Sequence, residues 1–221
     1  MLLVLENEVD PELRYFGREM RSYLPEHTVH DFANEGGHPS LSEVSGVIIS
    51  GSTAGVYERA EYPWMNEEIE FVRELVEREI PTLGVCFGHQ IVNHALGGSV
   101  EHRGLTNELV RADLADDPLF DGVSSVLPAV HGDHVVETGE GMETIASTEH
   151  NEHFATRHRD VPLWTTQFHP ELTNSLRPRV GRDFGWQETD ESFADVTGEL
   201  VFENFARLVE DHDSRDSTSP C

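Results

Sequence analysis

The sequence predicts an α/β fold in which a mostly parallel, open sheet is flanked by helices and extended by added antiparallel strands. Up to residue 98, short apolar segments typical of buried strands alternate with amphipathic helical segments. Residues 99–168 then contain short strand patterns separated by glycines. The 221 residues, of which 37% are hydrophobic, can build one sizeable core, which excludes a wholly disordered chain.

The strands of the first half are short and apolar. Residues 2–5 and 46–50 are runs of the kind that lie buried in parallel sheets, whereas residues 28–32 alternate only weakly. Residues 82–85 form a further strand, which directly precedes the most informative motif. Residues 11–23 can form a helix between the first two strands.

A second helix begins at Pro63, because proline favours the first turn of a helix and acidic residues stabilise its positive end. Pro81 ends this helix, and its acidic residues are expected to face solvent. Its buried face is predicted from four apolar residues spaced four, three and four apart: Met65, Ile69, Val72 and Val76.

The sequence after residue 98 predicts mainly short strands, with few long helices, within the same domain. Residues 199–209 form a last helix, and the domain is expected to span residues 1–211. Residues 212–221 are polar enough to predict a disordered tail. Turns are expected at four glycines: Gly122, Gly132, Gly139 and Gly141.

The charge of the chain excludes several classes of function. Its 42 acidic residues face 15 basic residues, all of them Arg, for a net charge of -27. Such a surface repels phosphate backbones and anionic lipids, so we expect neither a nucleic acid nor a membrane as a partner. We interpret the absence of Lys and the excess of acid as halophilic adaptation to a high-salt interior. The alternative is an ordinary acidic enzyme.

The two cysteines do not indicate a disulfide framework. Cys86 and Cys221 could form at most one bridge, and Cys221 ends the polar tail. No segment approaches the roughly 18 apolar residues that span a bilayer, and the N-terminus lacks the basic region of a signal peptide. A cytoplasmic location is therefore expected.

The clearest motif is Gly-Val-Cys-Phe-Gly at residues 84–88. An apolar strand runs into it and a helical pattern follows, as in a nucleophile elbow with Cys in place of Ser. The tight turn would strain the backbone of Cys86, and the glycines would remove clashing side chains. The thiol would lie at a helix N-terminus, whose dipole stabilises a thiolate. The alternative is a buried structural cysteine between two glycines.

Two further segments complete the chemistry. The strand end Gln-Phe-His-Pro-Glu places His169 at a strand terminus, where Glu171 can hold one ring nitrogen while the other faces the thiol. Alone, this His-x-Glu pattern indicates a solvated loop; beside the elbow it predicts a Cys-His-Glu triad. The buried strand that ends at Gly51 can supply one backbone N–H of an oxyanion hole, and Phe87 the other. The alternative interpretation of the segment at Gly51 is an ordinary turn between a strand and a helix.

Neither a metal nor a cofactor is expected. A zinc site needs convergent ligands, yet Cys86 already belongs to the elbow and the remaining histidines lie in polar stretches. No Gly-rich phosphate-binding loop is present, so ATP chemistry would belong to another chain. The histidines considered as ligands fall in two clusters: His89 and His94 beside Cys86, and His150, His153 and His158.

The elbow, the Gln-Phe-His-Pro-Glu strand end and the segment His-Gly-Asp at residues 131–133 together resemble the class I (triad) glutamine amidotransferases. Among these, the similarity is to amidotransferase domains of GMP synthases, and it covers roughly residues 44–171. The resemblance implies a flavodoxin-like fold and glutamine as the substrate. It implies these roles: nucleophile Cys86, base His169, orienting acid Glu171, oxyanion donors Gly51 and Phe87, and substrate contacts Gln90, Gly132 and Asp133.

Three functions stay open on the sequence. The first is a glutaminase subunit that feeds ammonia to a separate ATP-dependent synthetase subunit, which makes GMP from xanthosine monophosphate. The second is a stand-alone γ-glutamyl peptide or amide hydrolase, which the Ser-Thr at residues 52–53 and the long segment 172–198 leave possible. The third is an idle regulatory or binding module, against which the intact triad argues.

The charge excess generates a prediction about salt. Folding brings the 42 acidic residues together, and dissolved ions screen their repulsion. The screening length is about 3 Å at 1 M salt against about 10 Å at 0.1 M. We expect the chain to unfold or lose activity in dilute buffer and to regain structure in molar KCl. A melting temperature that stays flat or falls as KCl rises from about 0.1 M to about 3 M contradicts the halophilic interpretation.

Overall fold

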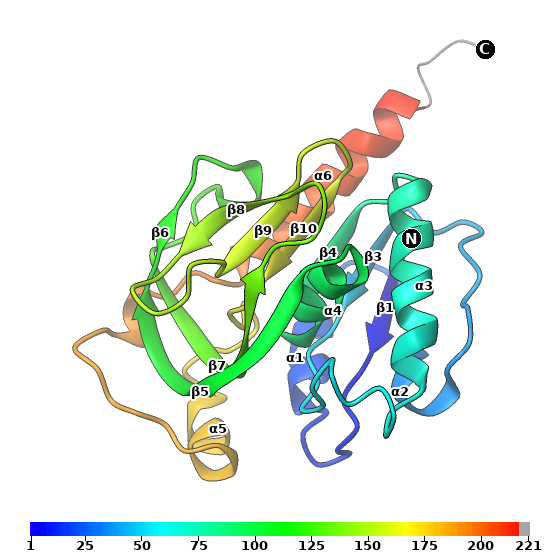
Figure 1. Ribbon diagram of the computed structural model, residues 1–221. Coiled ribbons are helices and arrows are strands. Elements are labelled where there is room, and N and C mark those ends of the chain that lie inside the picture. The colour runs from blue at the N-terminus through cyan, green and yellow to red at the C-terminus, as the bar shows by residue number, and fades with distance from the viewer. Residues whose placement is uncertain (217–221) are drawn as a thin grey trace.

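The computed structural model describes residues 1–216 and confirms the predicted α/β architecture. An eight-stranded sheet has the strand order β2-β1-β3-β4-β10-β9-β8-β6, and β5 pairs with β7 in a separate two-stranded sheet (Figure 1). The strands are β1 (Leu2–Glu6), β2 (His27–Asp31), β3 (Gly46–Ile49), β4 (Thr82–Val85), β5 (Ser99–Arg111), β6 (Asp113–Leu114), β7 (Val126–Glu137), β8 (Met142–Ser147), β9 (Ala155–His158) and β10 (Leu163–Thr166). The helices are α1 (Tyr15–Ser22), α2 (Phe32–Glu35), α3 (Trp64–Glu77), α4 (Phe87–Ala95), α5 (Arg177–Asp183) and α6 (Leu200–Asp216), with 3₁₀ turns η1 (Pro118–Phe120) and η2 (Phe193–Asp195).

The large sheet has a parallel and an antiparallel half. Strands β2, β1, β3, β4 and β10 are mutually parallel neighbours, as the alternation of strands and helices predicts. Strands β9, β8 and β6 continue the sheet in antiparallel pairing beyond β10. The carboxyl ends of β3, β4 and β10 therefore lie side by side at one edge of the sheet.

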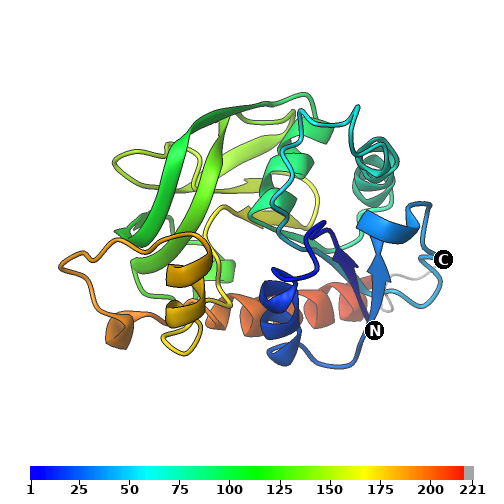
Figure 2. The same ribbon diagram turned by 90° about the horizontal axis from the view of Figure 1, so that it is seen from below.

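The inner parallel strands β1 and β3 are mostly apolar and fully buried because both faces of the sheet are covered, whereas β2, at the edge of the sheet, is polar. Leu2 and Val4 of β1 pack in a core with residues of α1 and α6, whereas Leu3 and Leu5 pack with residues of α3 and α4. Figure 2 shows these helices on opposite sides of the sheet. The face predicted for α3 is confirmed, with Met65, Ile69 and Val72 buried and Val76 partly buried against the same core.

The helix boundaries differ from the prediction at both ends of the chain. Helix α1 begins at Tyr15, after a turn, and not at residue 11. Helix α6 continues past Val209 to Asp216, so disorder was the wrong prediction for residues 212–216. Once the apolar face up to Val209 is packed, polar residues can extend the helix because each adds a hydrogen bond at little cost. The rest of the predicted tail, residues 217–221, lies outside the described residues.

The region after residue 98 contains longer strands than predicted. Gly122 and Gly141 have positive φ values of 75° and 80° at turns, but Gly132 lies inside β7, so the turn predicted there is wrong. The pairing of β5 with β7 is irregular between His102 and Thr106, opposite this glycine. A Cβ on Gly132 would lie 2.7 Å from His102 Cε1, so the glycine makes room for the bulged strand.

Within residues 1–216, no helix is both long and apolar enough to cross a bilayer.

One acidic side chain is buried beneath α3. Glu68 is 0% exposed; its Oε1 accepts a hydrogen bond from Asn7 Nδ2 at 2.8 Å, while Oε2 has no partner among the described residues. Burial raises the pKa of Glu68 to about 8, because the hydrogen bond from Asn7, which lowers the pKa, offsets only part of the effect of burial. The native carboxyl is therefore protonated at neutral pH.

This raised pKa predicts how stability depends on pH. Between the ordinary pKa of 4.5 and the native value of about 8, the native state keeps a proton that the unfolded state releases. Stability therefore falls as pH rises through this window, by about 1.4 kcal/mol per pH unit from this group. Glu68→Gln should lessen the decrease between pH 5 and pH 8 in urea unfolding, whereas Glu77→Gln, on an exposed position of the same helix, should not. An unchanged pH dependence in Glu68→Gln contradicts this assignment.

Candidate active site

Cys86 lies in a strained turn between β4 and α4. Its backbone angles, φ of 54° and ψ of -104°, are rare for a residue other than glycine. Its N–H donates a hydrogen bond to the Thr166 carbonyl at 2.7 Å. A Cβ on Gly84 would lie 2.5 Å from the Gly88 oxygen, and one on Gly88 would lie 2.3 Å from the Ile49 oxygen. Only glycines fit at these two positions, which is the steric requirement that the elbow motif predicts.

The second candidate group follows strand β10. His169 Nδ1 is 2.8 Å from Glu171 Oε1, and its Nε2 is 3.2 Å from the Val130 carbonyl oxygen of β7. The Cys86 thiol lies 3.9 Å from the same Val130 oxygen. His169 and Glu171 are buried, at 4% and 2% exposure. The structure thus brings Cys86 and His169 to one carbonyl and places Glu171 on the far nitrogen of the His169 ring.

The contacts of His169 indicate its protonation state. Both ring nitrogens face oxygen acceptors, so the ring donates to both only when each nitrogen carries a proton. Burial lowers the pKa of His169, but the Cys86 thiolate and the Glu171 carboxylate outweigh it and hold that pKa well above the ordinary 6.5. The geometry therefore suits an imidazolium beside a thiolate.

The two residues predicted to supply the oxyanion donors are neighbours of Cys86, one in space and one in sequence. A Cβ on Gly51, after β3, would lie 3.6 Å from Cys86 Cβ and 3.5 Å from His169 Cε1, so Gly51 is adjacent to both. Phe87 is the first residue of α4, where a backbone N–H has no acceptor within its own helix. Two backbone donors can therefore face a negative charge that develops next to Cys86.

The predicted substrate contacts line one cavity with Cys86. This cavity of about 270 Å³ is bounded by the loop after β3 and by β5 and β7, and Gln90, Gly132 and Asp133 all line it. Gln90 Nε2 donates to the Asp133 carbonyl at 3.2 Å, which links α4 to β7. The volume suits a molecule the size of a single amino acid, as the predicted substrate requires.

The structure adds residues that the sequence did not single out. Tyr57 Oη donates to Asp133 Oδ1 at 3.2 Å, and His102 Nδ1 lies 2.9 Å from the same oxygen, so both hold Asp133 at the cavity. Gln167 Nε2 lies 3.7 Å from Cys86 Sγ. Gln167 could have been found, because it lies in the same Gln-Phe-His-Pro-Glu segment as His169.

Phe16 of α1 is a further unpredicted contact. Its ring centroid lies 4.7 Å from that of His169. An aromatic face at this distance can stabilise a charged imidazolium and excludes water from it. Nothing in the sequence near Phe16 indicates this contact, because it depends on how α1 packs across the end of the sheet.

The histidine clusters do not form a metal centre in the described part of the chain, where no group of three or more His, Cys, Asp or Glu is arranged to hold an ion. His89 is fully buried, its Nδ1 lies 2.7 Å from Thr165 Oγ1, and burial lowers its pKa to about 3. A neutral His89 thus serves the packing of α4 against β10.

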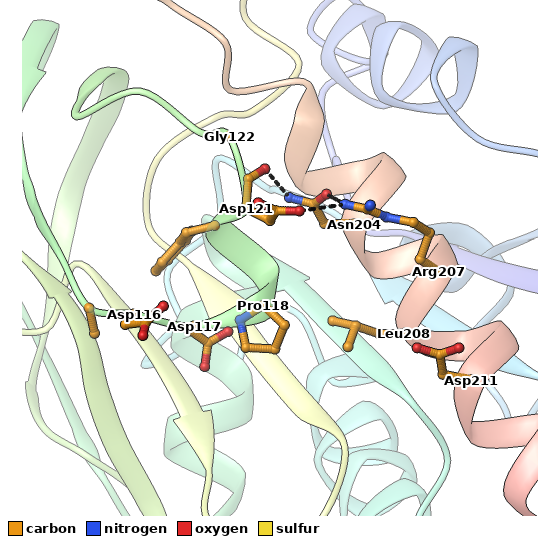
Figure 3. A pocket seen from close by; sticks show the side chains of 11 residues that line it. Asp116, Asp117, Pro118, Asp121, Gly122, Asn204, Arg207, Leu208 and Asp211 are labelled. Carbon is orange, nitrogen blue, oxygen red and sulfur yellow. Dashed lines mark hydrogen bonds and ion pairs between the residues drawn. The ribbon is translucent and has the colours of Figure 1, made fainter.

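A larger cavity of about 710 Å³ lies apart from Cys86, between η1 and α6 (Figure 3). Asp116, Asp117, Asp121 and Asp211 line it, and Asn204 Nδ2 donates to the Asp121 carbonyl at 2.9 Å on its wall. Its lining includes neither a cysteine nor a histidine, so it offers no counterpart to the chemistry around Cys86.

Comparison with known proteins agrees with this geometry. Residues 12–187 match the family described as "Glutamine amidotransferase class-I". A "GMP synthase [glutamine-hydrolyzing]" of Aquifex aeolicus is 35% identical over 137 residues, which cover 59% of this chain and 25% of that protein. One of Nitratiruptor sp. is 32% identical over 173 residues, or 74% of this chain and 28% of that protein. The chain thus spans about a quarter of the length of these curated relatives.

Solved structures share the fold along nearly the whole chain. One, described as a putative GMP synthase subunit from Thermoplasma acidophilum, has a TM-score of 0.73 at 17% identity and covers 98% of this chain and 96% of its own. A glutamine amidotransferase from Thermotoga maritima has a TM-score of 0.67 at 19% identity, covering 99% and 98%. At these identities the likeness shows the fold.

The charge pair at the site predicts a change in one titration. Burial lowers the pKa of His169, whereas Cys86 and Glu171 raise it. Because Cys86→Ala removes one of the two groups that oppose the effect of burial, it should lower the pKa of His169. NMR titration of the His169 ring protons measures the shift, with Cys221→Ala as the control that should leave it unchanged. A pKa of His169 that stays the same or rises in Cys86→Ala contradicts the charge pair.

Proposed function

Because the chain belongs to the class-I glutamine amidotransferases, we propose that it hydrolyses glutamine to glutamate and ammonia through Cys86, His169 and Glu171. One observation carries the proposal: the Val130 carbonyl is within 3.9 Å of the Cys86 thiol and 3.2 Å of His169 Nε2, and Glu171 occupies the other ring nitrogen. A nucleophile, a proton donor and an orienting acid therefore lie beside one another in space, in that order.

In the first half-reaction, the Cys86 thiolate attacks the side-chain carboxamide carbon of glutamine. The amides of Gly51 and Phe87 stabilise the oxyanion of the tetrahedral intermediate; the closeness of Gly51 to Cys86 and the position of Phe87 at the start of α4 support this role. His169 gives its Nε2 proton to the amide nitrogen, and the C–N bond breaks to release ammonia. The product on the enzyme is a γ-glutamyl thioester on Cys86.

In the second half-reaction, neutral His169 takes a proton from water, and the hydroxide attacks the thioester carbon. Collapse of this intermediate releases glutamate and restores the thiolate beside the imidazolium. Glu171 keeps its contact of 2.8 Å with Nδ1, which fixes the ring and stabilises its positive charge.

The substrate is held in the cavity of about 270 Å³. In this proposal Gln90 and the main chain at Gly132 and Asp133 contact the α-amino and α-carboxylate groups of glutamine. Support comes from their shared position along one wall and from the link between Gln90 and the Asp133 carbonyl. Tyr57 and His102 act on the substrate through Asp133, whose carboxylate they hold.

The ammonia acceptor in this proposal is a separate ATP-dependent synthetase subunit that converts xanthosine monophosphate to GMP. The curated relatives are named GMP synthases, and about three quarters of their length has no counterpart in this match. The alternative, a stand-alone γ-glutamyl hydrolase, is favoured by Ser52-Thr53, where GMP synthase domains usually have Gly-Pro. Co-purification of a synthetase chain from native cells distinguishes the two. The net charge of -27 supports a high-salt cytoplasm as the setting.

The assignment of the nucleophile predicts the loss of all activity in one variant. Cys86→Ala should abolish glutamate release from glutamine, because no other group can form the thioester, while the circular dichroism spectrum stays that of the folded chain. Cys221→Ala is the matched control and should keep full activity. Glutamate release by Cys86→Ala above a buffer blank contradicts the assignment.

The roles of the other two residues predict unequal losses. His169 transfers protons in both half-reactions, whereas Glu171 orients and stabilises the ring. His169→Ala should therefore lower kcat more than Glu171→Gln, by roughly tenfold or more. Steady-state kinetics with glutamine measures both variants. Equal losses, or a larger loss for Glu171→Gln, would show that the roles are misassigned.

A further inference from the structure

The proposed chemistry does not use residues 172–198, the long segment that follows Glu171. Helix α5 lies within this segment, and Gly185, with a φ of 74°, turns the chain after the helix ends. Phe184 directly precedes this glycine and lines the cavity of about 270 Å³ that also contains Cys86. The segment therefore brings one aromatic side chain to the candidate active site.

Strand β5 fixes the turn that carries Phe184. Asn107 Nδ2 donates a hydrogen bond to the Phe184 carbonyl at 2.9 Å, and the Gln187 N–H donates to the Asn107 carbonyl at 2.8 Å. Asn107 is buried, so water competes little for these two hydrogen bonds. The side chain and the main chain of Asn107 thus hold the two ends of the turn.

The ring of Phe184 lies on the His169 side of Cys86. It also lines a second, smaller cavity of about 50 Å³, whose wall includes both Cys86 and His169. The Phe184 ring centroid is 6.0 Å from that of Phe16, whose ring in turn lies 4.7 Å from the His169 ring. Phe184 packs against the apolar cluster that contains Val180 of α5, and this packing limits the other positions that the ring can take.

The two cavities share five residues, and Phe184 has the largest side chain among them. The shared residues are Ser52, Thr53, Cys86, Val130 and Phe184. In the proposed reaction the γ-glutamyl part occupies the larger cavity, and the amide nitrogen faces His169, which protonates it. A group attached to this nitrogen would therefore lie beside Phe184, where the smaller cavity offers about 50 Å³. Glutamine carries only hydrogens on this nitrogen, whereas a γ-glutamyl peptide carries an amino acid.

We propose that Phe184 is a specificity-determining residue that restricts the substrate to an unsubstituted γ-carboxamide. The basis is steric: a substituent on the nitrogen meets an aromatic ring held in a packed cluster, and the carbonyl carbon is then displaced from Cys86. Asn107 is a positioning residue, because it fixes the turn at Phe184. This inference rests on the proposed hydrolysis of glutamine and selects glutamine over γ-glutamyl peptides as the substrate.

The test compares four substrates on the full-length protein: glutamine, its N-methyl and N-ethyl amides, and γ-glutamylglycine. Glutamate release measures every rate, since all four share this product. In the wild type, kcat/KM should fall along the series as the substituent grows. Phe184→Ala should raise the ratio of kcat/KM for the N-ethyl amide to that for glutamine by roughly tenfold or more, and Phe184→Leu should raise it less.

The positioning role of Asn107 has its own variant. Asn107→Leu removes the donor to the Phe184 carbonyl at similar side-chain size, so the same ratio should rise, by less than in Phe184→Ala. A general loss of stability would lower both rates and leave their ratio unchanged. Combined with Phe184→Ala, Asn107→Leu should add nothing further, because no ring remains to be positioned. A ratio that Asn107→Leu leaves unchanged overturns the positioning role.

Phe193→Ala is the matched control for the segment. Phe193 packs on Trp186, with ring centroids 5.5 Å apart, but lines neither cavity at Cys86. Its removal should therefore leave the ratio unchanged, and an equal rise in Phe193→Ala overturns the assignment to Phe184.

Two further results would overturn the proposal while the chemistry at Cys86 stands. One is a ratio that Phe184→Ala leaves unchanged or lowers, and the other is a wild-type protein that hydrolyses γ-glutamylglycine as well as it hydrolyses glutamine. A wild-type protein that releases glutamate from none of the four substrates contradicts the proposed function instead, and the inference with it.

Discussion

The strand-to-helix turn at Cys86 is the constraint on which the rest of the site depends. A φ of 54° at a residue with a side chain is tolerated only because the chain approaches itself at Gly84 and Gly88 with no Cβ in the way. The turn lies where the parallel strands β3, β4 and β10 end together, so Gly51, Cys86 and His169 follow adjacent strands of the same sheet. A strained turn placed elsewhere would expose a thiol without a proton donor beside it.

The antiparallel part of the molecule completes this arrangement. Strand β7 brings the Val130 carbonyl to both Cys86 and His169, and it carries Asp133 along the wall of the larger cavity. The parallel sheet alone would position Cys86 and His169 but would leave this cavity without the wall that β5 and β7 provide. Helix α1 contributes from the other side, through Phe16 on the His169 ring and Gly17 beside Glu6. The surroundings of Cys86 and His169 thus come from different layers of the fold.

Local sequence was sufficient for the parts of the site that depend on one turn or one strand end. The elbow, the spacing of His169 and Glu171, and the buried strands could be predicted because neighbouring residues decide them. Gly132 was misinterpreted as a turn because its missing side chain accommodates His102, a residue distant in sequence. The contacts of Tyr57 and Phe16 depend likewise on packing between layers. The extension of α6 to Asp216 reflects helix propagation from a packed face, which polar composition does not indicate.

We propose that the elbow presents Cys86 as a nucleophile that faces a glutamine site. The most direct measurement is peptide mass spectrometry after treatment of the native protein with a chloroketone analogue of glutamine. The account predicts that Cys86 is alkylated, that glutamine slows this alkylation, and that Cys221 is spared. Alkylation of Cys221 at the same rate, or a Cys86 that stays unmodified or is not protected by glutamine, would contradict it.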